Sequence, residues 1–145
     1  MKIGDVMNKR AVRIENTATL KDAARVVAET QASDLMVVDR DGHFVGVLSE
    51  GDIIRAALPN YDDLMRDGTS LGGAWKIFLD KGKELRDTGI EKLVIRNPIT
   101  FKSDEELLKA ASTMVNKQIR VLPVVDDGKL AGTISRGDIC HAVLG

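Results

Sequence analysis

The chain has 145 residues, 43% of them apolar, which is enough for one folded unit with a hydrophobic core. Its 21 basic and 22 acidic residues give a net charge of −1, which argues against nucleic acid or a membrane as the main partner, because both attract basic surfaces. Cys140 is the only cysteine, so an internal disulfide is excluded and a cytoplasmic location is predicted.

The first half of the chain is typical of a β-α-β-β-α unit. Residues 12–14 favour an extended segment, and residues 19–29 favour a helix because apolar side chains recur at helical spacing. Apolar runs at 35–38 and 44–48 flank a polar turn that contains glycine, which predicts a hairpin. A helix over residues 51–58 completes the unit.

Residues 59–89 form a different kind of segment, which follows the first unit. Glycines at 68, 72 and 73 predict loops there, and a helix is expected over 74–85. One face of that helix is apolar. It would cover the edge of the core, contact a second subunit, or close over a ligand. The residues of this face are Leu71, Trp75, Phe78 and Leu79.

The second half repeats the order of the first. Ser103 and Glu106 have the spacing of a capping box and predict a helix start. We predict an extended segment at 99–101, a helix at 104–116, strands at 121–125 and 130–134, and a final helix at 137–144.

The two halves also repeat each other in sequence. Residues 42–58 read GHFVGVLSEGDIIRAAL, and residues 128–144 read GKLAGTISRGDICHAVL. We therefore predict a mixed α/β (α+β) fold of two pseudo-symmetric repeats, at 1–58 and 90–145, that pack sheet against sheet around one shared core. Any ligand site in one repeat then has a potential twin in the other.

Each repeat carries the motif Gly-x-x-Ser-x-Gly-Asp where a strand enters a helix. A helix start offers free N–H groups to an anion, and an ionised aspartate suits the two hydroxyls of a ribose. Gly46 and Gly132 would let a ligand approach the backbone. Helix capping alone also favours serine and aspartate at this spacing, so a purely structural role stays open.

These features resemble the CBS domain (named for cystathionine β-synthase), and the tandem arrangement resembles a stand-alone Bateman module. The strands LMVVD at 35–39 and LPVVD at 122–126 and the two Gly-x-x-Ser-x-x-Asp turns carry the resemblance. The resemblance implies a ligand cleft between the repeats. It assigns to one site Val12, Arg13, Ala32, Ser33, Val47, Ser49 and Asp52, and to the other Ile99, Thr100, Ile119, Arg120, Thr133, Ser135, Arg136 and Asp138.

The two predicted sites differ in charge. The second has Arg120 and Arg136, whereas Ser33, Asp34 and Glu50 stand at or beside the matching places of the first. Because arginine binds phosphate and a carboxylate repels it, we expect the Asp138 site to prefer phosphorylated ligands. The alternative is that these charges face water.

The resemblance implies a non-catalytic regulatory module that binds AMP, ADP, ATP or a ligand like S-adenosylmethionine or NADH, and that requires no cofactor or metal. It also implies a homodimer that acts on a separate target protein, which the sequence does not identify. The alternative is a dimeric scaffold protein with vestigial pockets. We expect no enzyme, because the sequence offers no credible nucleophile or acid/base pair.

Overall fold

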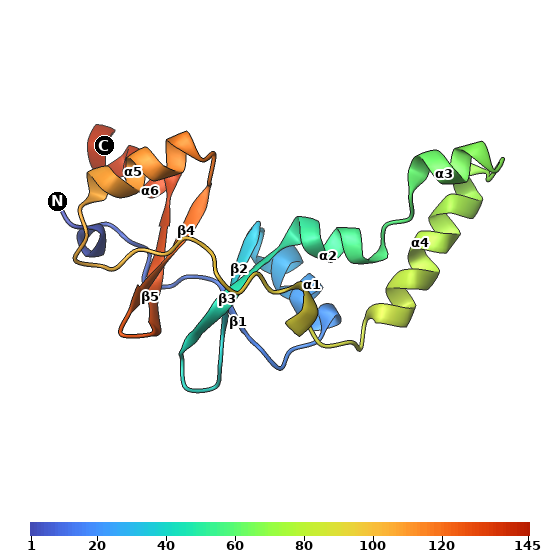
Figure 1. Ribbon diagram of the computed structural model, residues 1–145, viewed down its shortest axis with the longest axis horizontal. Coiled ribbons are helices and arrows are strands. Elements are labelled where there is room, and N and C mark those ends of the chain that lie inside the picture. The colour runs from blue at the N-terminus through green and yellow to red at the C-terminus, as the bar shows by residue number, and fades with distance from the viewer.

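The computed structural model describes all residues from Met1 to Gly145. The two repeats form the body of the molecule, and a helical arm projects from its end (Figure 1). The first repeat contains β1 (Arg13–Glu15), α1 (Leu20–Thr30), β2 (Asp34–Val38), β3 (Phe44–Ser49) and α2 (Glu50–Ala57). The second contains α5 (Leu107–Asn116), β4 (Val121–Asp126), β5 (Lys129–Ser135) and α6 (Arg136–Leu144). The predicted mixed fold is confirmed.

Two small sheets form the body. In the first, β1 runs parallel to β2, and β2 pairs antiparallel with β3. In the second, β4 pairs antiparallel with β5. The predicted extended segment at 99–101 contributes a single parallel bridge, Phe101 to Val124, and no full strand. The second sheet therefore has two strands where the first has three.

Three apolar clusters stabilise the body. Each repeat has its own core of eight buried residues, one around Leu35 and Leu48 and the other around Leu122 and Ile134. A smaller cluster of Met36, Val38 and Leu130 joins the two sheets. The prediction of one shared core was therefore wrong. Each repeat has a core of its own, and only the small third cluster is shared between them.

Each repeat receives its first segment from the other half of the chain. The N-terminal 3₁₀ turn, η1 (Ile3–Asp5), places Ile3 in the core of the second repeat, where its exposed fraction is 0%. Conversely, η2 (Glu91–Leu93) follows Ile90, which lies in the core of the first repeat. The two halves therefore cannot separate without opening both cores.

The arm consists of α3 (Tyr61–Arg66) and α4 (Leu71–Leu85). The sequence did not predict α3, and it predicted that Gly72 and Gly73 lie in a loop. Both glycines belong to the first turn of α4, because the Ser70 hydroxyl accepts a hydrogen bond from the Gly73 N–H and caps the helix. Only the far end of α4 joins the core of the first repeat, through Leu85.

The predicted capping box of the second repeat is absent. Helix α5 begins at Leu107, and its N-cap, Glu106, makes no side-chain cap. Ser103 instead donates its N–H and its hydroxyl to the Asp126 carboxylate, at 2.9 and 2.6 Å. This contact ties the segment before α5 to the end of β4, so the helix starts later than residue 104.

Candidate functional site

A cavity of about 290 Å³ lies between the two repeats. Three predicted site residues of the second repeat, Ile99, Ile119 and Arg120, line it together with Val47 of the first. The remaining lining residues were not predicted: Asp34, Ile95, Pro98, Gln118, Val121, Leu122 and Pro123. The cavity is thus apolar along most of its wall, with one guanidinium and one carboxylate, and it draws on both repeats as the resemblance implies.

Ser135 and Asp138 lie at the start of α6, and neither of them lines this cavity. Val121, in the cavity wall, pairs with Ser135 across the β4–β5 ladder. The Ser135 hydroxyl accepts from the Asp138 N–H at 3.0 Å, and Asp138 Oδ2 accepts from the Ser135 N–H at 2.9 Å. This is a complete capping box, which the sequence predicted as the structural role. It engages one carboxylate oxygen and leaves Oδ1 free to accept from a ligand hydroxyl.

The equivalent residues of the first repeat are arranged differently. The Ser49 hydroxyl accepts from the Asp52 N–H at 3.1 Å, but the Asp52 carboxylate pairs with Arg55 on the next turn of α2. Hydrogen bonding to Arg55 is the main cause that lowers the pKa of Asp52, although partial burial opposes it. Each carboxylate keeps one oxygen without a protein partner, but the charge of Asp52 is already paired with a guanidinium, whereas Asp138 has no ion pair.

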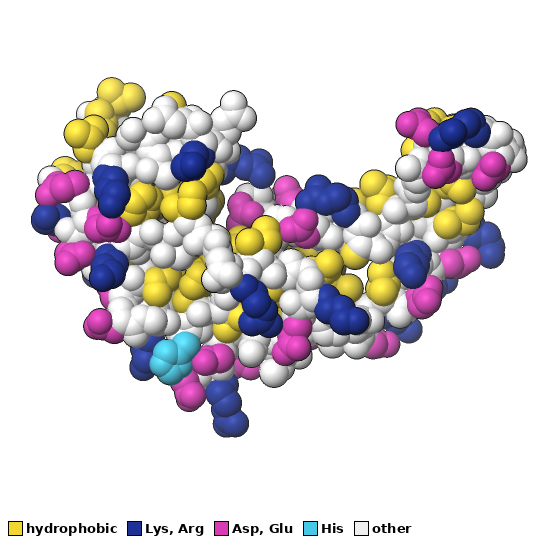
Figure 2. Space-filling view, viewed as in Figure 1, with side chains coloured by type: hydrophobic (Ala, Val, Ile, Leu, Met, Phe, Trp, Pro, Cys, Tyr) yellow, Lys and Arg dark blue, Asp and Glu magenta, His cyan; other side chains and the backbone are white.

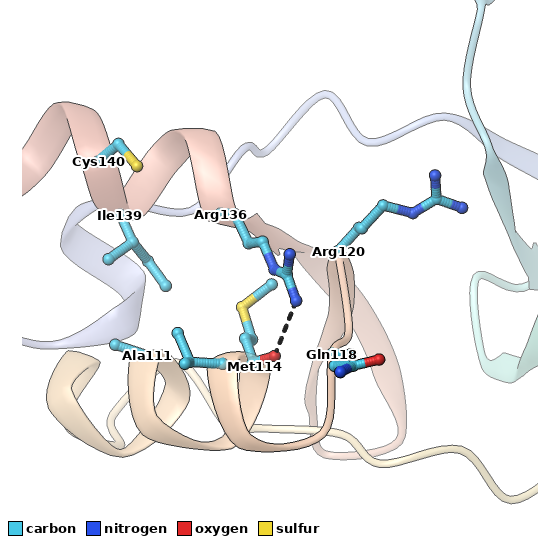
Figure 3. Close-up of a pocket in the computed structure, with 8 residues that line it drawn as sticks. Ala111, Met114, Gln118, Arg120, Arg136, Ile139 and Cys140 are labelled. Atoms are coloured by element: carbon cyan, nitrogen blue, oxygen red, sulfur yellow. Dashed lines mark hydrogen bonds between the residues drawn. The ribbon is translucent and has the colours of Figure 1, made fainter.

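Arg136 does not join the inter-repeat cavity. Its guanidinium donates to the carbonyl oxygens of Ile119, at 2.9 Å, and Met114, at 3.2 Å, and so caps the C-terminal end of α5 (Figure 3). This geometry gives Arg136 a structural role, because exposed carbonyls at a helix end attract a cation, and its place at the ligand stays a prediction. Arg120 is therefore the one arginine of the predicted pair that lines the cavity.

Several other predicted residues also lie outside the cavity. Thr133 is buried, and its backbone pairs with Asn8. Thr100 is exposed, and Arg13 is exposed on β1. Val12, Ala32 and Ser33 are half-buried in the first repeat, where Ser33 donates to Asp34 at 3.2 Å. Together with Arg13, these three residues belong to the site that the resemblance assigns to the first repeat.

The motif glycines make room for protein backbone. A Cβ on Gly46 would lie 2.2 Å from the Ile95 carbonyl oxygen, and a Cβ on Gly132 would lie 2.5 Å from that of Asn8. The prediction that these glycines admit a ligand was therefore wrong. They admit the segments that cross from the other half of the chain.

Two of the cavity residues that were not predicted stand directly beside predicted ones in the sequence. Asp34 directly follows the predicted Ser33, and Pro98 precedes the predicted Ile99. Ile95 had none, because its position depends on the crossing segment that pairs it with Val47.

Comparison with known proteins agrees with this architecture. The family model of the CBS domain matches residues 3–59 and 90–145. The chain is 34% identical over 155 residues to an uncharacterized protein of Methanocaldococcus jannaschii, MJ1426, covering 99% of this chain and 92% of that protein. It is 41% identical over 152 residues to the chloroplastic CBS domain-containing protein CBSX2 of Arabidopsis thaliana, of which it spans 63%.

The chain also superimposes on a solved structure of CBSX2 in complex with AMP, with a TM-score of 0.74 and 25% identity, covering 99% of this chain and 96% of that one. The fold and the inter-repeat cavity define a CBS-domain pair. This chain belongs to the CBS-domain family and carries two copies of the domain. None of its helices is both long and apolar enough to cross a membrane.

Proposed function

We propose that this protein is a non-catalytic regulatory module that binds an adenosyl ligand in the cavity between its repeats, with the Asp138 site as the principal site. The observation that carries the proposal is the cavity that joins Ile99, Ile119 and Arg120 to Val47 of the other repeat. The AMP complex of the structurally similar CBSX2 supports the ligand class.

The residues supply the three kinds of contact that a nucleotide needs. Ile99, Ile119 and Val47 offer apolar walls for a flat base. The free oxygen of Asp138 suits a ribose hydroxyl. Arg120 is exposed at the cavity and can donate several N–H groups to a phosphate.

Charge and size favour a ligand with few phosphates. Asp34 lines the same cavity as Arg120, and Arg136 is committed to the carbonyls of α5. The local balance is therefore one positive and one negative side chain. The volume of about 290 Å³ lies just below the range of about 300–1,000 Å³ typical for small-molecule sites. Both features favour AMP or an uncharged adenosyl thioether over ATP.

A bound ligand would act on the relative placement of the repeats, because the cavity takes residues from both. Such a change requires a ligand that binds one arrangement more tightly than the other. The proposal includes a homodimer in the cytoplasm that passes this change to a separate target protein.

Titration calorimetry with AMP, ADP, ATP, S-adenosylmethionine and NADH tests the proposal. We expect AMP to bind more tightly than ATP, and Asp138→Asn to weaken AMP binding. Asp52→Asn is the matched control, because Asp52 occupies the equivalent position of the other repeat. Absence of heat with every ligand, from folded protein, would contradict the proposal and favour a scaffold protein with vestigial pockets.

A further inference from the structure

The short connection between α5 and β4 forms a large part of the cavity wall. Gln118, Ile119 and Arg120 all belong to this connection, and all three line the cavity between the repeats. The surface is hollowed between the second repeat and α2, with side chains of both charges beside the hollow (Figure 2). The contacts that fix the connection therefore also fix the shape of the cavity on the side of the second repeat.

The backbone of this connection adopts an unfavourable conformation. Gln118 has a φ of 56°, in the left-handed region that a residue with a side chain rarely occupies. Its N–H lies 3.4 Å from the Val115 carbonyl oxygen, which is a long hydrogen bond. The Ile119 N–H donates to the Met114 carbonyl at 2.9 Å. Such a conformation persists only where surrounding contacts hold it.

Arg136, at the start of α6, supplies three of these contacts. Its Nε donates to the Ile119 carbonyl at 2.9 Å, and its Nη2 donates to the Met114 carbonyl at 3.2 Å. Its backbone N–H donates to the Arg120 carbonyl at 3.2 Å. Figure 3 shows the Arg136 side chain turned toward the end of α5 and the Arg120 side chain turned away from it. One residue of α6 thus holds the segment that carries Ile119 and Arg120.

The same turn of α6 carries the predicted ribose contact. Asp138 forms its capping box with Ser135 there and does not line the cavity. A ligand that reaches both parts of the site needs a fixed distance between the Asp138 carboxylate and the wall formed by Ile119 and Arg120. The Arg136 side chain ties these two parts of the site together.

The first repeat has no such tie, because Glu50 stands at the position of Arg136. The Glu50 N–H repeats the backbone bond and donates to the Ser33 carbonyl at 2.9 Å. An ionised carboxylate has no donor, however, so this side chain cannot bind carbonyl oxygens. The connection after α1 is held from within that helix, where the Gln31 amide donates to the Ala28 carbonyl at 2.8 Å.

We propose that Arg136 is a positioning residue for the ligand site of the second repeat, where it fixes Ile119 and Arg120 relative to Asp138. A site that is ordered before the ligand arrives loses less entropy on binding, so its affinity is higher. This role rests on the proposed function. It also gives a reason why the Asp138 site is the principal one, since the first repeat has a glutamate in place of the arginine.

Calorimetric titration of Arg136→Gln with AMP and with adenosine tests this role. We expect the dissociation constants of both ligands to rise about 10-fold and by equal factors, because the base wall and the phosphate contact shift together. Arg136→Lys keeps a cation at the end of α5 and should recover most of the loss. Lys117→Gln is the matched control, because it removes one positive charge from an exposed position of the same connection. It should change either constant by less than about twofold.

The two ligands separate positioning from direct contact. A loss confined to AMP would make Arg136 a phosphate contact and would overturn the positioning role, and unchanged binding of both ligands would overturn it too. A wild type that binds neither ligand would instead overturn the proposed function, and this role with it.

Hydrogen exchange of the ligand-free protein, followed amide by amide with NMR, tests the tie without a nucleotide. We expect the Ile119 amide to exchange about 10 times faster in Arg136→Gln than in wild type. The Ile95 amide, which donates to the Val47 carbonyl at 2.8 Å, should keep its rate. Equal acceleration of both amides would mean a general loss of stability, and an unchanged rate at Ile119 would mean that Arg136 does not hold the connection. Either result would overturn the proposal and leave the proposed function standing.

Discussion

Asn8 and Thr133 exchange two backbone hydrogen bonds, from Asn8 N–H to the Thr133 carbonyl at 2.8 Å and from Thr133 N–H to the Asn8 carbonyl at 3.0 Å. Asn8 belongs to the first repeat in sequence and Thr133 to the second. Ile95 and Val47 form the symmetric exchange, at 2.8 and 3.0 Å. Two crossing segments therefore link the repeats, and each lies against a motif glycine.

Because the crossing segments lie so close, we predict that any side chain at those glycines lowers the free energy of unfolding. Gly132→Ala would place a Cβ 2.5 Å from the Asn8 carbonyl oxygen, so the backbone must shift. We expect a loss of about 1–3 kcal/mol in the free energy of unfolding, measured by urea denaturation. Gly82→Ala is the control, because its Cβ meets nothing within 4 Å and alanine favours the helix. Equal stability of Gly132→Ala and wild type would contradict the crossing.

The buried position of Ile3 predicts that the N-terminal segment stabilises the second repeat. Ile3→Ala should lower the free energy of unfolding by about 2–5 kcal/mol, because a fully buried isoleucine side chain is lost. Lys9→Ala, at an exposed position of the same segment, should change stability by less than about 0.5 kcal/mol. Chemical denaturation of the two variants provides the comparison, and similar small effects would place the segment outside the core.

The exchange of segments also predicts that both repeats unfold together. Ile3 and Ile90 each lie in the core of the other half, so neither core survives the opening of its partner. We expect one calorimetric transition in which the calorimetric and van't Hoff enthalpies agree. Two separate transitions would show that each repeat folds alone.

Much of this fold was accessible from the sequence, because apolar periodicity and glycine-containing turns are local signals. The crossing segments were not accessible, since the pairing of Asn8 with Thr133 joins residues far apart in the chain. The start of α4 was missed because the Ser70 cap offsets the poor helix propensity of Gly72 and Gly73.

The site was predicted through repeat symmetry and family resemblance. Ile99, Ile119 and Arg120 were assigned to one site and do line one cavity, but Val47, assigned to the twin site, lines that same cavity. Symmetry also could not reveal that Arg136 binds the carbonyl of Ile119. Asp34 enters the same cavity from the other repeat, which a comparison of the repeats one by one does not show.

Acid should destabilise the protein through Asp126. Hydrogen bonds from Ser103 are the main cause that lowers the pKa of this carboxyl. A carboxyl with a lowered pKa in the folded state stabilises that state above its unfolded pKa, about 3.9, and this contribution is lost as the pH falls toward the folded pKa. We expect the free energy of unfolding to decline below about pH 4.

Asp126→Asn checks this cause. The variant should be less stable than wild type at neutral pH, and the difference should shrink in acid, as measured by urea denaturation across the pH range. A difference that does not depend on pH would assign the acid sensitivity to other carboxyls.

Arg120 should act on the phosphate alone. Arg120→Ala should weaken AMP binding by about 1.5–3 kcal/mol, because a charge-assisted hydrogen bond is lost, and leave adenosine binding nearly unchanged. Calorimetric titration of both ligands into both proteins gives the comparison. Equal losses for AMP and adenosine would mean that Arg120 shapes the cavity and does not contact the phosphate.

The position of a bound nucleotide tests the central claim most directly. In a crystal structure of this protein grown with AMP, we expect the base between Ile99 and Ile119, a ribose hydroxyl on Asp138 and the phosphate near Arg120. A structure with this cavity empty, or with AMP bound only outside it, would contradict the account.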